Sequence, residues 1–222
     1  MTTGESSEPV RLPPPTRRRR RARASRNADT TAATRVDILK SAAKAFRRRG
    51  YHGATVETIA AALRMKKGNL YYYFKSKEEI LFACHQYSLD RLLRLLDEVE
   101  HSGFAPAQKL RALIVASVHL ILDELHGTAL ILELEALSAA HLKEVITSRD
   151  RLDHGIRQVI EEGIADGSFS PDDVKLRSFA LLGAMNWIPR WFNPAGPSTS
   201  SEIADRFADY LIAGLRRQSV DR

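Results

Sequence analysis

The sequence has a single cysteine, Cys84, among its 222 residues. One cysteine excludes a disulfide-stapled fold and a four-cysteine zinc site, and it is compatible with a reducing compartment. The chain also lacks an apolar run of about 20 residues, the length that spans a bilayer. Its longest apolar-rich stretch, Leu110–Leu122, is interrupted by Arg111 and His119. No apolar segment follows the N-terminal arginines, as it would in a signal peptide. We therefore expect a cytoplasmic protein that has no membrane partner.

Signatures of catalysis are missing as well. The sequence contains no glycine-rich phosphate loop, no HExxH motif and no nucleophile elbow, and its seven histidines are scattered. Glu133 and Glu135 are two residues apart, so a helix would point them to different faces. His119 and Asp123 have i, i+4 spacing and can share a metal with a third ligand, although a local hydrogen bond is the simpler interpretation. We expect neither an enzyme nor a metal or cofactor.

Charge is divided unevenly along the chain. Residues 1–77 carry 19 Lys and Arg against five Asp and Glu, whereas residues 78–222 carry 15 against 22. This division predicts two parts with different partners, of which the basic part faces a polyanion. Within the basic part, residues 1–31 hold four prolines and eight arginines, and their only large aliphatic residues are Val10 and Leu12. We expect these residues to form a disordered Arg-rich arm, because they have little apolar surface to bury.

The rest of the chain predicts helices. No proline occurs between residues 16 and 105, and apolar residues at helical spacing mark one face of the first helix: Val36, Leu39, Ala43 and Phe46. Gly50 ends this helix, and Thr55 and Ser76 are N-cap candidates for later ones. We expect helices over residues 34–49, 55–63, 66–74, from 77 onward, 106–126, 128–139, 140–166, 171–192 and 200–217. No stretch alternates as a strand would, so the fold class is all-α.

Two short helices joined by a tight break, behind a supporting helix, form a helix-turn-helix unit. Leu70 and Phe74 are spaced i, i+4 and can dock the second short helix, Lys66–Phe74, on the core. Its other side chains spread around the remaining faces: Lys66, Lys67, Asn69, Tyr71, Tyr72 and Tyr73. Lys can donate to guanine, Asn can pair with adenine and Tyr can reach phosphate, while Gly68 lets the backbone approach a groove floor. Alternatively the tyrosines are core or boundary residues and the lysines a solvated face, but three adjacent tyrosines cannot all face one core.

The segment Ala54–Leu81, which reads ATVETIAAALRMKKGNLYYYFKSKEEIL, resembles the DNA-binding signature of the TetR family of bacterial transcriptional regulators. Ile38, Leu39, Phe46 and Gly50-Tyr51 also agree with the first helix of that family. The resemblance implies a homodimer with three DNA-binding helices per subunit, over residues 32–92, and a helical effector-binding and dimerisation domain over residues 93–222. It also implies a repressor that a small effector releases from a palindromic operator.

The resemblance assigns individual roles to residues of the motif. Base contacts fall to Lys66, Lys67, Gly68, Asn69, Tyr71 and Tyr72. Phosphate contacts fall to Thr55, Tyr73 and Lys77. Two positions depart from the family pattern, since Arg64 replaces the usual glycine of the turn and Lys66 replaces a small N-cap residue. A residue other than glycine is strained in a left-handed turn, so we expect the turn to be wound differently. Alternatively, Arg64 beside the groove strengthens the attraction to phosphate. The Arg-rich arm can enter the minor groove or act as a nonspecific tether.

The second half is expected to hold the dimer interface and the effector site. In the family the last two long helices pair across a two-fold axis, and here they carry apolar side chains: Phe179, Leu182, Phe207, Tyr210, Leu211 and Leu215. The segment 186–197 contains both tryptophans of the chain, and it is similar to the tail of TetR-type regulators of fatty-acid and steroid breakdown, whose effectors are acyl-CoA thioesters. Its effector candidates are Asn186, Trp187, Arg190 and Trp191, together with His119. Alternatively the tryptophans are ordinary core and Arg190 caps its helix.

Two readings of other classes stay open. A helical enzyme or carrier that binds acyl-CoA could use the basic arm only as a tether to nucleic acid. A membrane-surface protein could place the same arginines on anionic lipid, but no apolar face lies beside them.

Overall fold

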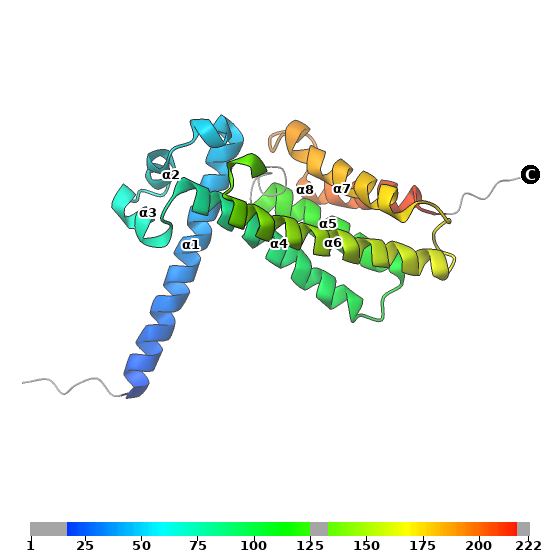
Figure 1. Ribbon diagram of the computed structural model, residues 1–222, viewed down its shortest axis with the longest axis horizontal. Coiled ribbons are helices and arrows are strands. Elements are labelled where there is room, and N and C mark those ends of the chain that lie inside the picture. The colour runs from blue at the N-terminus through cyan, green and yellow to red at the C-terminus, as the bar shows by residue number, and fades with distance from the viewer. Residues whose placement is uncertain (1–16, 125–132, 217–222) are drawn as a thin grey trace, which may run out of the picture. The chain divides into compact units, whose positions relative to one another are not determined.

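The computed structural model describes residues 17–124 and 133–216 (Figure 1). Within these ranges the chain forms eight α-helices and no strand, which confirms the all-α prediction. The chain divides into two units between Val36 and Asp37. Among the described residues, no helix combines the length and the apolar character needed to cross a membrane.

Helix α1, Arg17–Gly53, begins earlier than we expected. Residues 17–31 are helical, although we predicted that the whole segment 1–31 would be disordered. No proline follows Pro15 in this region, and Arg and Ala are strong helix formers, which explains the difference. Residues 1–16 lie outside the described residues. Near the other end the helix is broken at Gly50 (φ 68, ψ 169), the glycine predicted to end it.

The head, which we define as residues 37–76, contains the end of α1, α2 (Val56–Ala62) and α3 (Lys67–Tyr73). Its core is closed by apolar side chains that are at most 1% exposed: Ile38, Phe46, Ile59, Leu70 and Phe74. Leu70 is the one buried residue within α3, and Phe74 directly follows that helix. The i, i+4 pair therefore docks α3 on the head, as the spacing predicted.

Helix α4, Lys77–Glu100, belongs to both halves of the protein. Ser76 caps its start by accepting a hydrogen bond from the Glu79 amide at 3.0 Å. Near this end Cys84 donates its thiol to the carbonyl of Leu39 in α1, and burial raises the pKa of that thiol to about 12. Three turns later Leu96 lies so close to Gly155 of α6 that a Cβ on this glycine would fall 2.2 Å from it. The domain boundary expected at residue 92 thus falls inside a continuous helix.

Helices α5 (Pro106–His119), α6 (Ala139–Ala165), α7 (Val174–Trp191) and α8 (Ser200–Ala213) complete a bundle with α4. Figure 1 shows α4, α5 and α6 side by side, with α7 beside α6 and α8 beside α5. Gly163 of α6 is packed by the Phe169 ring as Gly155 is by Leu96, with 2.1 Å from a Cβ to that ring. Both glycines in the interior of α6 therefore allow close approach.

Two predicted helices end differently in the structure. Helix α5 stops at His119 and continues as a π-helix, Leu120–Glu124, rather than as α-helix to residue 126. Of the helix expected over residues 128–139, the described part is a 3₁₀ turn, Leu134–Ala136. Ser138 then caps α6 by accepting from the His141 amide, and such a cap requires non-helical backbone at this position. The segment 125–132 lies outside the described residues.

Candidate nucleic-acid interface and effector cavity

A capping box holds the start of α2. Thr55 accepts from the Thr58 amide and donates its own amide to the Thr58 hydroxyl, both at 3.2 Å. The Thr58 hydroxyl in turn donates to the Thr55 carbonyl at 2.8 Å. The N-cap role predicted for Thr55 is confirmed, and its exposed side chain remains a predicted phosphate contact.

The turn between α2 and α3 is held in a left-handed conformation at Arg64 (φ 54). The different winding that we expected is therefore not found. The Arg64 amide donates to Ala61 at 3.0 Å, and the Met65 amide donates to Ala60 at 2.9 Å. These bonds on either side hold Arg64 in a conformation that costs about 1–2 kcal/mol for a residue other than glycine.

Helix α3 presents most of its surface to solvent. Leu70 is 0% exposed, whereas Tyr72 is 81% exposed and Tyr71 is 42% exposed. Tyr73 is half-buried against the core, and its ring meets that of Tyr72 edge to face at 5.3 Å. The remaining predicted contacts on this helix and its N-cap are all exposed: Lys66, Lys67, Gly68 and Asn69. Only Tyr73 therefore fits the alternative that the tyrosines are boundary residues.

Lys67 is held toward α2 in this structure. Its ammonium lies 2.5 Å from the Glu57 carboxylate and 5.6 Å from the centre of the Tyr71 ring. The hydrogen bond from Lys67 lowers the pKa of Glu57, and the same bond raises the pKa of Lys67. Both groups are exposed, so the pair can open when a phosphate or a base edge competes for the ammonium. Lys66 is the N-cap of α3 and makes no side-chain cap bond.

Lys77 has a role that sequence reasoning missed. Its ammonium donates to the carbonyls of Tyr51 at 2.8 Å and Ala54 at 3.0 Å, and it lies 4.2 Å from the centre of the Tyr51 ring. Two of its three N–H donors thus tie the start of α4 to the segment that precedes Thr55. The phosphate contact that the resemblance assigns to Lys77 stays a prediction, which the third donor can serve.

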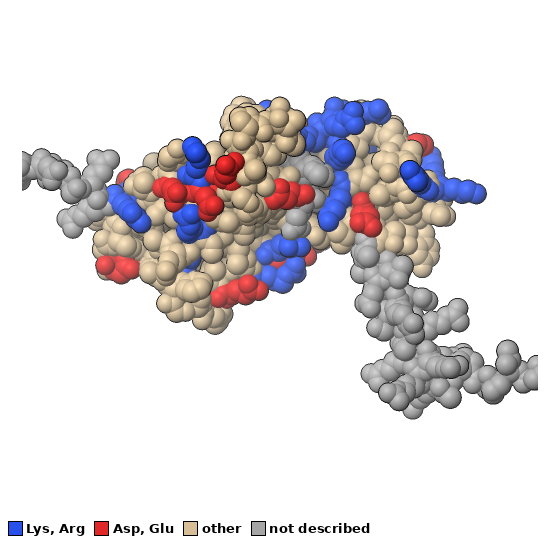
Figure 2. Space-filling view, turned by 180° about the vertical axis from the view of Figure 1, so that it is seen from behind, with Lys and Arg blue, Asp and Glu red and all other residues tan. Residues whose placement is uncertain are grey.

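Basic side chains accumulate on the head. On the face shown in Figure 2, Lys and Arg gather over this end of the molecule, whereas over the bundle they are interspersed with Asp and Glu. This is the surface distribution that the uneven charge of the sequence predicted. The side chains of the Arg-rich arm lie outside the described ones, so its minor-groove role stays a prediction.

Polar contacts that the sequence did not reveal join the start of α4 and the head to residues 133–141. The Glu78 carboxylate accepts from the Ser138 amide at 2.9 Å and from the His141 ring at 2.7 Å, and that ring stacks on Phe82 at 3.8 Å. Burial alone would raise the pKa of Glu78, but these hydrogen bonds outweigh it and the pKa is lowered. Glu133 accepts from the Tyr51 amide at 3.1 Å. The two bonds of Glu78 therefore hold the start of α6 against the start of α4.

A small cavity of about 60 Å³ lies inside the bundle. Four helices contribute its lining: Leu89, Leu92, Ser117, Arg149, Leu152, Leu182, Met185 and Asn186. Asn186 is the effector candidate from the sequence that reaches this cavity. Arg149 is a charged lining residue that sequence reasoning missed, and burial lowers the pKa of its guanidinium.

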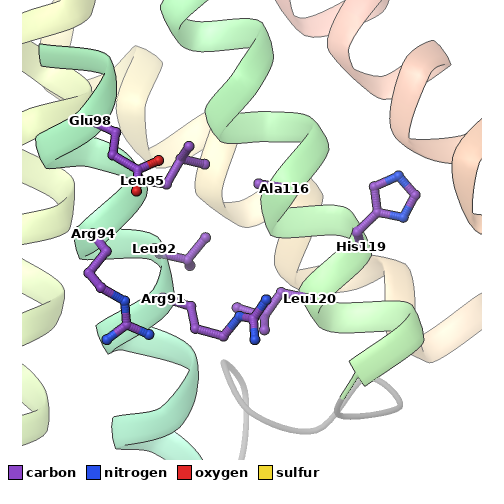
Figure 3. A pocket seen from close by; sticks show the side chains of 8 residues that line it. All are labelled: Arg91, Leu92, Arg94, Leu95, Glu98, Ala116, His119 and Leu120. Atoms are coloured by element: carbon purple, nitrogen blue, oxygen red, sulfur yellow. The ribbon is translucent and has the colours of Figure 1, made fainter. Parts of the chain in front are cut away.

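A second, larger hollow of about 470 Å³ opens between α4 and α5 (Figure 3). We call it the α4–α5 groove, and its lining is Arg91, Leu92, Arg94, Leu95, Glu98, Ala116, His119 and Leu120. The predicted candidate His119 belongs to this lining, but Figure 3 shows its ring turned away from Leu92 and Leu95. His119 Nδ1 is 2.8 Å from the Asp123 carboxylate, which is the local hydrogen bond that the spacing favoured.

The other three effector candidates are not among the residues that line either hollow. Trp187 is 63% and Trp191 48% exposed, and Arg190 is exposed with its guanidinium 5.9 Å from the centre of the Trp187 ring. Helix periodicity explains this placement, because each step along α7 turns the side chain by about 100° and only Asn186 follows the inward Leu182 and Met185. An effector role for the other three residues stays a prediction.

These outward residues extend an apolar face of α7 and α8. Its exposed members are Leu176, Phe179, Trp187, Trp191 and Tyr210. The half-buried Phe207 joins the two helices by stacking on Trp191 at 5.9 Å. Gly183 lies on the same stretch of α7, and a Cβ there would meet nothing within 4 Å. Leu215, which we expected on this face, is buried within the subunit. A face of this kind is typical of a protein–protein interface.

Comparisons with known proteins agree on one family. Residues 38–84 match the model for bacterial regulatory proteins of the tetR family, and residues 103–215 match the model for the tetracyclin repressor-like C-terminal domain. The chain is 29% identical over 196 residues to the HTH-type transcriptional repressor KstR2 of Mycolicibacterium smegmatis, with 86% of this chain and 95% of that protein covered.

Solved structures with the same fold include two whose sequences are also similar. The ketosteroid transcriptional regulator KstR2 of Mycobacterium tuberculosis has a TM-score of 0.72 and 25% identity, with 83% of this chain and 96% of that chain covered. AibR in complex with isovaleryl coenzyme A and operator DNA has a TM-score of 0.66 and 27% identity, with 81% of this chain and 96% of that chain covered.

Proposed function

The chain belongs to the TetR family of bacterial transcriptional regulators. We propose that it binds operator DNA through α3 and releases this DNA when an effector enters its helical bundle. It is a DNA-binding regulator of the repressor type, like the KstR2 proteins to which it is similar. Such a regulator acts on chromosomal DNA, which places it in the cytoplasm. Its chemistry is binding rather than turnover.

The exposure of α3 is the observation that carries this proposal. One face of the helix is anchored by Leu70, which is 0% exposed, and the opposite side presents Tyr72, which is 81% exposed. A recognition helix needs this arrangement, because its outer side chains must reach base edges while its inner face stays fixed. Asn69 suits adenine, and Lys66 and Lys67 suit guanine.

Dimerisation completes the DNA-binding unit. The exposed apolar face of α7 and α8 supplies an interface, and Gly183 allows a partner helix to approach closely. Two copies related by a two-fold axis place two α3 helices on successive major grooves about 34 Å apart. The operator is therefore expected to be palindromic.

We propose an acyl-CoA thioester as the effector class. The similarity to AibR, solved with isovaleryl coenzyme A and operator DNA, supports this choice. Helix α4 supplies the route for the signal, because Leu89 and Leu92 line the inner cavity while Ser76 at its start follows α3 directly. A ligand that shifts α4 also shifts α3, and two misaligned α3 helices no longer match both half-sites.

Operator binding by variants of α3 tests the DNA-reading role. Tyr72→Ala and Asn69→Ala should weaken operator binding by about 10-fold or more, since a base contact is worth about 1–3 kcal/mol. Binding to random DNA should change little, and it should fall steeply with salt. Gln158→Ala, which removes an exposed side-chain amide from α6, serves as the control. Equal losses on operator and random DNA would remove these residues from base reading.

Incubation with a thioester tests the absence of turnover. A regulator should bind isovaleryl-CoA and return it unchanged, as followed by chromatography of the ligand. Hydrolysis or transfer that depends on the protein would favour the enzyme or carrier reading instead.

A further inference from the structure

The α4–α5 groove and the inner cavity meet at one side chain. Leu92 lines both of them, from the surface on one side and from the interior on the other. The groove contains two exposed arginines, Arg91 and Arg94, whereas the inner cavity is lined mainly by leucines and a methionine. Leu92, which is 2% exposed, therefore stands between a groove with cationic side chains and a cavity that is mainly apolar.

The groove is polarised along its length. Arg91 and Arg94 are spaced i, i+3, so their guanidinium groups emerge on neighbouring positions of α4. Figure 3 shows both guanidinium groups at one end of the groove and the Glu98 carboxylate at the other, with Leu92 and Leu95 between them. Arg91 also donates an N–H to the Tyr87 hydroxyl at 3.1 Å, and its guanidinium lies 5.6 Å from the centre of the Tyr87 ring. An anion is therefore favoured at the arginine end and disfavoured beside Glu98.

The inner cavity offers polar groups at a few points of an apolar wall. Ser117 donates its hydroxyl to the Leu113 carbonyl at 2.6 Å, and Asn186 and Arg149 also line the space. An amide or guanidinium N–H can donate to the carbonyl of an acyl group, while the leucines cover its alkyl part.

We propose that Arg91 and Arg94 bind the phosphates of an acyl thioester effector whose acyl end passes Leu92 into the cavity beside Asn186. This inference rests on the proposed function and gives its effector a site and a direction. Arginine recognises phosphate through paired, charge-assisted hydrogen bonds, so these two side chains supply the affinity for the carrier. The apolar cavity supplies the preference for the acyl group, since its burial removes apolar surface from water.

Titration calorimetry with three probes distinguishes binding of the phosphates in the α4–α5 groove from binding of the acyl group in the inner cavity. The probes are coenzyme A, isovaleryl-CoA and isovalerate, each added to the full-length protein. Wild type should bind isovaleryl-CoA more tightly than coenzyme A and should not bind isovalerate measurably. Arg94→Gln should weaken both phosphate-bearing probes by about 10-fold, and Arg91→Gln should do the same. Arg206→Gln, which removes an exposed arginine from α8, should change neither.

A filled cavity should give the complementary result. Leu182 is half-buried, and Leu182→Phe should reduce the preference for isovaleryl-CoA over coenzyme A while the affinity for coenzyme A itself is kept. This ratio is measured within one variant, so a general loss of stability does not imitate it.

The outcomes separate the inference from the proposed function. If isovaleryl-CoA binds wild type and releases the operator but Arg91→Gln and Arg94→Gln bind it equally well, the assignment of the groove is wrong and the proposed function stands. If isovalerate binds as tightly as the thioester, the phosphate role is wrong. If no thioester binds wild type, the effector class and this site both fail.

Discussion

The head and the bundle solve different recognition problems. The predicted DNA contacts lie within one short stretch, residues 64–77, apart from Thr55, and almost all of them are exposed. The lining of the inner cavity instead comes from α4, α5, α6 and α7, which are distant in sequence. DNA lies outside the protein and can be read by one exposed helix, whereas a small effector must be enclosed from several sides. A function on a single element can be predicted from its sequence, and an enclosed site cannot.

The two regions also differ in how they are coupled. The head carries the basic excess and the bundle a more balanced surface, yet α4 begins directly after the head and continues into the bundle without a break. Glu78 near the start of α4 is bonded to the start of α6. These bonds therefore tie the start of α4, directly after the head, to the bundle.

Loss of the buried Leu70 side chain should cause the largest change in stability. Leu70→Ala should lower the free energy of unfolding by about 2–5 kcal/mol, because it leaves a cavity under α3. Tyr72→Ala should change the same quantity by no more than about 0.5 kcal/mol, because that side chain is exposed. Chemical denaturation followed by circular dichroism measures both. Similar losses in the two variants would contradict the division of α3 into an anchoring and a reading face.

Glu78→Gln tests the link between the start of α4, directly after the head, and the start of α6. The variant weakens the bonds to Ser138 and His141 and should cost about 1–2 kcal/mol of stability. The pKa of Glu78 is lowered in the folded protein, so its contribution is present above the unfolded value of about 4.5 and is lost as pH falls below it. Melting curves between pH 7 and pH 3 should therefore converge for wild type and variant at low pH.

The control for this link is Glu100→Gln, which removes an exposed carboxylate at the end of α4. It should leave the melting curve of wild type unchanged across the same range. A constant difference between Glu78→Gln and wild type at every pH would show that the ionised carboxylate is not what stabilises the contact.

Gly68→Ala separates stability from DNA binding within the head. A Cβ at Gly68 would meet nothing within 4 Å, so the free protein should be as stable as before or more stable by up to about 1 kcal/mol. Operator affinity should nevertheless fall by roughly tenfold, because the methyl group separates the backbone from the groove floor. Gly103→Ala is the matched control, since a Cβ there also meets nothing within 4 Å. Undiminished operator binding by Gly68→Ala would show that this glycine is not close to the DNA.

Arg64→Gly should have the smallest effect. Relief of the left-handed strain should raise the free energy of unfolding by about 1 kcal/mol or less, since added chain entropy offsets part of the gain. Arg64→Lys keeps both the charge and the strain, so it should leave stability unchanged. If Arg64 also contacts a phosphate, Arg64→Gly should weaken the binding of operator DNA and of random DNA to the same extent. The affinity for DNA should then depend less steeply on salt. A loss of stability in Arg64→Gly would show that the left-handed backbone at Arg64 does not strain the folded protein.

Local signals in the sequence predicted much of the head. Gly50, Thr55 and Ser76 mark helix ends through their own backbone preferences and short-range hydrogen bonds, so each was predicted and found. The i, i+4 pair of Leu70 and Phe74 predicted which face of α3 is buried.

Long-range contacts were beyond the sequence. The outward direction of Trp187 and Trp191 depends on where neighbouring helices leave α7 uncovered, and aromatic composition carries no such information. The sequence indicates only a surface charge at Lys77. The fold places the carbonyls of Tyr51 and Ala54 within hydrogen-bond distance of its ammonium. At Arg17 the sequence did hold the relevant signal. The composition of residues 1–31 led us to predict disorder, whereas the helix propensity of Arg and Ala favours the helix that begins there.

Helix by helix, the order of residues was enough to determine an all-α chain and which side of α3 is buried, because capping and periodicity act over a few neighbouring positions. The tertiary structure alone decided which side chains enclose a space, which face of α7 stays open and which bonds tie α4 to α6. Those features depend on how helices pack across large separations in sequence, and packing is settled by the shapes of all the partners together.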